Sequence, residues 1–328
     1  MIALTDLQSA LAPAGEQAAR IAQLWWVFLW VLTAVFVIVA SFLFFAILRS
    51  RREPRESAAE LVALIPEEGS ERRASRIVIA ALIATVAILF ALLLYDFFTG
   101  RAIYAITSAP DPLIIKVTGH QWWWEVEYEN EAEPSKMLTT SNELHVPVGK
   151  AVKLELQSVD VIHSFWVPNL QGKKDLIPGH PTETWLKADR TGTFRGQCAE
   201  FCGHQHAHMR FTLVANSPAQ FESWMNSQRA DAPEPSTDSA RRGREVFLSS
   251  QCAMCHAISG TNARATVGPD LTHIASRDLT GAAIRNTRGY LAGWILNPQN
   301  IKPGARMPTI ELSADDLNAL LEYLESLK

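Results

Sequence analysis

Two long apolar stretches dominate the first hundred residues of the chain. Residues 21–48 and 77–95 contain no charged side chain. A helix needs about 20 apolar residues to cross the hydrocarbon core of a bilayer, so each stretch is long enough to do so. The pattern therefore predicts a transmembrane hairpin over residues 21–100, with spans at about 21–48 and 77–98 and a connecting loop at 49–76.

The connecting loop indicates how this hairpin is oriented. Residues 49–76 are rich in arginine, and short positive loops are retained in the cytoplasm. Both termini and everything after residue 100 are then expected outside the cytoplasm. Residues 1–20 lack the basic start and apolar run of a cleaved signal peptide, so we assign them to an outward-facing N-terminal segment.

Beyond residue 100 the apolar runs become short and alternate with polar residues, as in β-strands. Such runs are Leu113–Val117, Val152–Leu156 and Phe211–Val214. Turn residues, mainly proline and glycine, separate them, which favours a β-sandwich or barrel. We predict one all-β domain of the Greek-key type over residues 101–225.

The pattern changes again near the C-terminus. Residues 226–240 are polar, contain two prolines and hold nothing aromatic, which is typical of a linker. Leucines recur at helical spacing after Ser313, whose hydroxyl is well placed to cap a final helix. Residues 241–328 are therefore predicted to form a small all-α domain.

Composition excludes several classes of function. The chain has 328 residues, a formal net charge of −4 and no stripe of lysine or arginine, which argues against a nucleic-acid partner. It also lacks a nucleophile motif such as G-x-S-x-G. We predict no catalytic residue in this chain, and candidate chemistry lies instead in two cysteine motifs.

The downstream motif is Cys252-Ala253-Met254-Cys255-His256. Its two thiols can add to the two vinyl groups of one haem, and the adjacent histidine can then ligate the iron. A disulfide, a zinc half-site and a thioredoxin-like redox pair are the alternatives.

A second axial ligand must come from elsewhere in the chain. Met307, on a loop rich in proline and glycine, is favoured over Met254 and His273. A thioether opposite histidine raises the haem potential. With Gly268-Pro269-Asp270-Leu271 and the terminal helix, residues 241–328 resemble a class I cytochrome c. The resemblance implies one haem c bound covalently to Cys252 and Cys255, with His256 and Met307 as axial ligands.

The upstream motif holds more soft ligands than one metal ion can use. Residues 197–209 contain two thiols, three imidazoles and a thioether, a mixture that points to copper. A mononuclear blue-copper site needs one thiolate, so Cys198 and Cys202 suggest two copper ions with the thiolates between them. His163 is the candidate for an imidazole from another strand. A disulfide between the two cysteines, and a core role for His163, are the alternatives.

At this point the chain resembles subunit II of a haem–copper cytochrome c oxidase, which carries the binuclear CuA centre. The motif C-x-E-x-C-G-x-x-H-x-x-M occupies residues 198–209, D-V-x-H-S occupies 160–164, and the match extends over residues 20–226. It implies a cupredoxin-like fold. The resemblance further implies that Cys198 and Cys202 bridge the coppers, that His163 and His206 bind one copper each, that Met209 is a weak ligand, and that Glu200 contributes its backbone carbonyl.

The resemblance implies roles beyond the copper ligands. The Glu200 side chain reaches a magnesium ion at the contact with subunit I, and His204 and His208 are not ligands. Trp122, in the run H-Q-W-W-W, is the candidate relay through which electrons reach CuA. On a regular strand Trp122 would point to the same face as Trp124.

The chain as a whole resembles subunit II of a caa-type oxidase of a bacterial inner membrane. The implied route carries electrons from cytochrome c or a membrane donor to haem c, then to CuA, then to the haem–copper subunit I, where oxygen is reduced. Other oxidase subunits are implied partners. The alternatives are an electron-transfer subunit of another haem–copper reductase, such as a nitric oxide reductase, and a copper-delivery or thiol-redox protein.

Overall fold

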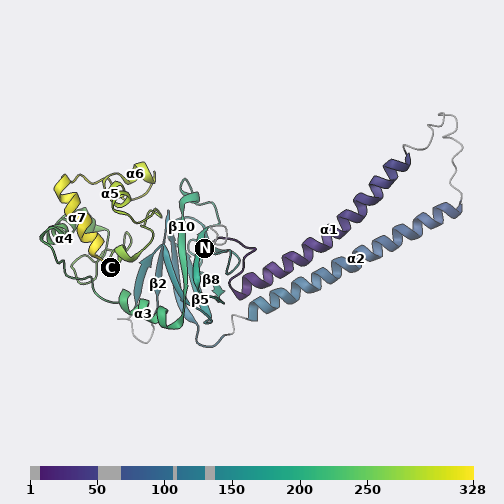
Figure 1. The fold of residues 1–328 in the computed structure, drawn as a ribbon, viewed down its shortest axis with the longest axis horizontal. Helices are drawn as coiled ribbons and strands as arrows, with labels where there is room; N and C mark the ends of the chain where they lie inside the picture. The colour runs from purple at the N-terminus through teal and green to yellow at the C-terminus, as the bar shows by residue number, and fades with distance from the viewer. Residues whose placement is uncertain (1–7, 51–67, 106–108, 130–136) are drawn as a thin grey trace. The chain divides into compact units, whose positions relative to one another are not determined.

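The computed structural model describes residues 8–50, 68–105, 109–129 and 137–328, coloured along the chain in Figure 1. The chain forms two compact units, one of residues 20–105 and the other of residues 1–19 and 106–328. Most of the predicted cytoplasmic loop lies outside the described residues.

Two helices make up the described part of the first unit, although the first four residues of the first helix belong to the second unit. The helices are α1 (Glu16–Ser50) and α2 (Glu68–Tyr104), and both are long and apolar enough to cross a membrane. Each extends beyond the apolar run that predicted it, because alanine, glutamate and arginine at its flanks are good helix formers. Large apolar side chains such as Phe36 and Phe42 are exposed, as expected for helices that face lipid.

The second unit contains a sandwich of two five-stranded sheets. The first has the order β3 (Leu138–Ser141), β2 (Trp123–Tyr128), β1 (Leu113–His120), β5 (Val152–Ser158) and β8 (Thr182–Leu186). The second has the order β4 (Glu143–Pro147), β10 (Arg210–Asn216), β9 (Gly192–Cys198), β6 (His163–Trp166) and β7 (Lys174–Leu176). Along β5 every second residue is buried, which is the alternation that predicted it.

The second sheet determines where the upstream cysteine motif lies. Strands β9 and β10 are antiparallel, and the loop between them begins at Cys198 and ends at Met209. Strand β6 pairs with β9, with Phe165 opposite Cys198, so His163 enters the same region from a neighbouring strand. The loop turns at Gly203, whose φ of 109° is readily adopted only by glycine.

The C-terminal segment, defined here as residues 238–328, is helical. It contains α4 (Asp238–Ser249), η6 (Gln251–Met254), η7 (Ile274–Ser276), α5 (Arg288–Leu296), α6 (Pro298–Ile301) and α7 (Ala314–Ser326). Helices α4 and α7 cross closely at Gly243, where a Cβ atom would lie 2.0 Å from the Ala319 carbonyl oxygen. Ser313 caps α7, as predicted, by accepting a hydrogen bond from the Asp316 amide.

The predicted fold class is confirmed: a two-helix hairpin is followed by an all-β domain and an all-α segment. The predicted linker differs in detail. Helix α3 (Pro218–Gln228) continues into residues 226–228, and α4 begins at Asp238, so the irregular connection covers residues 229–237. Asp231 accepts a hydrogen bond from Ser259 at 2.7 Å, which ties this connection to the C-terminal segment.

Candidate functional site

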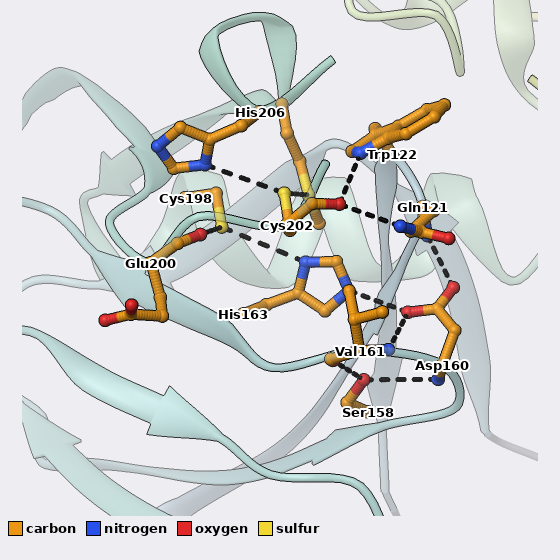
Figure 2. A network of polar contacts seen from close by, with 11 residues as sticks. Gln121, Trp122, Ser158, Asp160, Val161, His163, Cys198, Glu200, Cys202 and His206 are labelled. Carbon is orange, nitrogen blue, oxygen red and sulfur yellow. Dashed lines mark hydrogen bonds and ion pairs between the residues drawn. The ribbon is translucent and has the colours of Figure 1, made fainter. Parts of the chain in front are cut away.

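Two buried thiols and one buried imidazole form the centre of the candidate metal site. Ligand atoms of His163, Cys198 and Cys202 all lie within 4.8 Å of one another. The Cys198 Sγ atom is 3.8 Å from His163 Nδ1, and the Cys202 Sγ atom is 3.6 Å from His206 Nδ1. Figure 2 shows the two imidazoles on opposite sides of the thiol pair.

Two further predicted ligands lie against the same thiols. The Met209 thioether, which is fully buried, is 3.8 Å from Cys202 Sγ. The Glu200 carbonyl oxygen is 3.1 Å from Cys198 Sγ, whereas its carboxylate points away and lies 3.5 Å from Lys173 Nζ. His204 and His208, from the same loop, are exposed.

The side chain of Asp160 orients His163. Its Oδ1 atom lies 2.8 Å from His163 Nε2 and accepts from the Val161 amide at 2.7 Å, while Oδ2 accepts from the Gln121 amide at 2.7 Å (Figure 2). With Nε2 held as the donor, Nδ1 presents a lone pair toward Cys198. Burial opposes ionisation of Asp160, but these hydrogen bonds outweigh it and hold the pKa of the carboxyl below its usual value.

The ionisation of the thiols indicates what the site can bind. The hydrogen bond from Cys202 lowers the pKa of Cys198 to about 4, whereas that bond and burial raise the pKa of Cys202 far above its usual range. Without a cation, therefore, one thiol ionises only beside a partner that stays protonated. A soft cation shared by both sulfur atoms would stabilise both thiolates. The donor set of two sulfurs, two imidazoles, a thioether and a carbonyl thus fits copper.

Trp122 contacts this loop directly. Its indole Nε1 donates to the Cys202 carbonyl at 2.8 Å, and Gln121 Nε2 donates to the same oxygen at 2.8 Å (Figure 2). Strand β2 begins one residue later, at Trp123, so strand alternation does not govern where Trp122 points. Its side chain is buried against the cysteine loop.

The downstream motif lines a cavity that the C-terminal segment forms together with Trp122 and neighbouring residues of the sandwich. The cavity is lined by Cys252, Cys255 and His256 of this motif. Trp294 and Met307, which come later in the sequence, also line it. Its walls also include the apolar residues Leu271, Ile274, Leu291, Ile295 and Leu324. Two thiols, an imidazole and a thioether around an apolar cavity fit a haem attached through the cysteines.

His256 is prepared for ligation. Its Nδ1 atom lies 2.7 Å from the Pro269 carbonyl oxygen, and burial lowers the pKa of its imidazole, which favours the neutral form that binds iron. Gly268 packs so closely that a Cβ atom there would lie 2.7 Å from His256 Cε1. The competing ligands differ: Met254 is exposed, and the two ring nitrogens of His273 already face the main-chain oxygens of Ala230 and Lys328.

Two functional features escaped the sequence interpretation. The orienting contact of Asp160 had a signal, since an acidic residue three positions before a candidate ligand suggests such support. No sequence signal pointed to Lys302, because a lysine before Pro303-Gly304 is typical of a solvent-exposed turn. In the structure Lys302 is only 3% exposed, and its side chain reaches from the C-terminal segment to the Trp122 carbonyl.

Comparison with known proteins gives two family matches. Residues 129–216 match the family described as "Cytochrome C oxidase subunit II, periplasmic domain", and residues 240–328 match the family described as "Cytochrome c". Cytochrome c oxidase subunit 2 of Alkalihalophilus pseudofirmus is 36% identical over 327 residues, which cover 98% of this chain and 91% of that protein. The protein of the same name from Bacillus subtilis is 32% identical over 232 residues, or 67% of this chain and 64% of that protein.

A solved structure is also similar. It is the periplasmic domain of subunit II of the cytochrome oxidase of Bradyrhizobium japonicum, 35% identical, with a TM-score of 0.34 over 36% of this chain and 93% of that one.

Proposed function

This chain belongs to the cytochrome c oxidase subunit II family, and we propose that it passes electrons from a covalently bound haem c, through a binuclear copper centre, to a haem–copper subunit I that reduces oxygen. The fused C-terminal segment is of the cytochrome c family. The observation that carries the proposal is the pairing of two buried thiols, each beside its own imidazole, in one unit with a cavity lined by C-x-x-C-H and Met307.

In this proposal each residue near the coppers has one task. Cys198 and Cys202 would hold the copper through their sulfurs, His163 and His206 would each supply an imidazole, and Met209 and the Glu200 carbonyl would be weak ligands. Asp160 fixes the His163 ring, and the apolar interior keeps water from the sulfurs. When bound, the copper and the haem supply one-electron redox couples of the kind that soft ligands and His/Met ligation produce.

The haem ligands follow the same logic. Cys252 and Cys255 would attach the haem, and His256 and Met307 would bind its iron.

Two further parts of the proposal concern the membrane and the partner. The two apolar helices anchor the chain, and the family's periplasmic domain lies outside the cytoplasm. We place both termini outside as well, with the arginine-rich loop inside. Phe201, between the two cysteines, is 75% exposed, which supports a covering partner such as subunit I next to the copper loop. A magnesium ion at the Glu200 carboxylate belongs to the same proposed contact.

A metal and haem inventory of the detergent-extracted chain tests this function. We expect two coppers per covalently bound haem, and oxygen uptake in a preparation that retains subunit I. One labile copper without a covalent haem would instead support a copper-delivery protein. A full cofactor complement that reduces nitric oxide but not oxygen would support the other reductase class.

A further inference from the structure

The β-sandwich and the C-terminal segment, which belong to one compact unit, are joined by hydrogen bonds in both directions. From the sandwich, Asn142 Nδ2 donates to the Thr280 carbonyl at 2.9 Å, and Gln205 Nε2 donates to the Pro303 carbonyl at 3.0 Å. From the C-terminal segment, Lys302 Nζ donates to the Trp122 carbonyl at 2.5 Å. The acceptor in each of these contacts is a main-chain carbonyl, whose position is fixed by the fold. The contacts therefore favour one orientation of the C-terminal segment relative to the sandwich.

Lys302 is the most unusual of these donors. Its ammonium group is buried and contacts two carbonyl oxygens, that of Trp122 and, at 3.3 Å, that of Ala282. No ion pair joins it to a carboxylate in the part of the chain that the structure describes. Burial lowers the pKa of this amine to about 7, which shows how unfavourable the position is for a charge. Burying such a group is costly unless its hydrogen-bond partners are in place, so Lys302 disfavours arrangements that lack these two carbonyls.

Two residues after Lys302, the main chain itself touches Trp122. A Cβ atom at Gly304 would lie 3.1 Å from Trp122 Cη2, and the φ of 88° at Gly304 favours glycine independently. The other edge of the same indole donates to the Cys202 carbonyl. Trp122 therefore bridges the cysteine loop to the loop that carries Met307 three residues further on.

Backbone conformation at the contact between the sandwich and the C-terminal segment indicates that this contact is specific. Ala283 has a φ of 57°, in the left-handed region that alanine avoids, and Asn142 has a φ of 55°, which asparagine tolerates better. Both take part in contacts between the sandwich and the C-terminal segment, since the Ala283 carbonyl accepts from Arg210 Nε at 3.0 Å. Strain of this kind persists where the surroundings determine the conformation, often at functional sites.

We propose that Lys302 is a positioning residue for electron transfer within the chain: by bridging the Trp122 and Ala282 carbonyls, it holds the C-terminal segment in the orientation that lays Gly304 against Trp122. The inference rests on the proposed function, because it assigns the route between the two cofactors. It also implies that Trp122 is covered by the chain's own haem segment, so that an external donor reduces the haem and not the copper.

Lysine acetylation of the assembled oxidase tests the burial directly. The rate for each lysine is compared between the native and the urea-unfolded chain by mass spectrometry. We expect Lys302 to be protected at least tenfold more than Lys150, whose side chain is 44% exposed. Equal labelling of the two lysines would overturn the proposal even if no variant could be made.

Kinetics of substituted oxidases test the role. Lys302→Met removes the shared donor from two buried carbonyls, and Gly304→Ala forces the Trp122 contact apart. After flash reduction of the haem, we expect both variants to reduce the copper at least tenfold more slowly, with unchanged haem potential and copper spectrum. Lys150→Met is the matched control and should transfer at the wild-type rate.

The two proposals fail in different ways. Wild-type transfer rates in both Lys302→Met and Gly304→Ala would overturn the positioning role while leaving the proposed function intact. A wild-type oxidase whose reduced haem never reduces its copper would instead overturn the proposed function.

Discussion

Replacing Asp160 by asparagine should loosen the copper site without touching a ligand. Asp160 uses two oxygens for three donors: His163 Nε2 and the Val161 amide share Oδ1, and the Gln121 amide donates to Oδ2. The side chain of Asp160 is only 8% exposed, so water cannot replace a lost partner. Asparagine has nearly the same shape but only one acceptor oxygen, and its amino group must face one of these donors.

The expected effect is large because the substitution removes an acceptor oxygen and also places an amino group against a hydrogen-bond donor. Outer partners of a metal-bound histidine are typically worth 10-fold to 100-fold in metal affinity, or about 1.4–2.8 kcal/mol. A buried donor left without an acceptor adds roughly 1–3 kcal/mol against the folded site. We therefore expect Asp160→Asn to bind copper about 100-fold more weakly and to unfold at a lower temperature.

Copper affinity is measured by competition with a Cu(I) chelator, and folding is followed separately by circular dichroism. Asp111→Asn is the matched control, because the Asp111 side chain is 93% exposed and far from any predicted ligand in sequence. Equal copper affinity and unchanged optical spectra in Asp160→Asn would refute the argument that this carboxylate holds His163 in its ligating orientation.

Three other perturbations have defined outcomes. Phe201→Asp should leave the copper spectrum intact and reduce co-purification of subunit I at least several-fold; full retention of the partner would contradict a contact at this exposed ring. Cleavage of the connection at residues 229–237 should slow copper reduction and make it depend on protein concentration, and unchanged first-order kinetics would argue against a tethering role. The third concerns pH. The pKa of Lys302 is about 7 when the residue is buried and 10.5 when it is free. Between pH 7 and 10.5, association of the C-terminal segment with the sandwich therefore releases a proton and is favoured by rising pH. The fast phase of haem-to-copper transfer should accordingly grow as pH rises above 7. Lys302→Met should abolish that rise, and a flat wild-type profile would contradict it. The other titratable or charged groups that line the cavity beside Lys302 are His120, Asp160, Cys252, Cys255, His256 and Arg306.

Local patterns were sufficient for most of the fold. Alternating burial along β5 and the leucine spacing of α7 arise from residues close in sequence, and both elements form as predicted. The candidate ligands within residues 198–209 were equally predictable from the sequence, because one loop between adjacent strands carries them. His163 needed the pairing of β6 with β9, which the sequence motif suggested but local spacing could not supply.

Features that depend on distant pairing were not predictable. Strand alternation would turn Trp122 to the same face as Trp124, but β2 begins only at Trp123. Trp122 is nevertheless buried, and its contact with the Cys202 carbonyl lies 80 positions away. Asn142 and Lys302 contact residues 138 and 180 positions away, respectively, and nothing in their neighbourhoods signals those contacts. A buried lysine contradicts the ordinary preference for the surface, so only the tertiary structure reveals it.

The connection between the two redox segments changes how tethering is understood. A free linker of 15 residues would reach roughly 20 Å and act only by raising the local concentration of the haem. Here residues 231 and 232 are held on Ser259, so much of the connection is fixed to the segment it carries. A segment also joined to the sandwich through Lys302, Gln205 and Asn142 does not search a large volume before each transfer. The connection at residues 229–237 keeps the C-terminal segment near the sandwich, whereas the buried contacts determine the distance and orientation between the two proposed cofactor sites. Electron transfer depends on that distance and orientation.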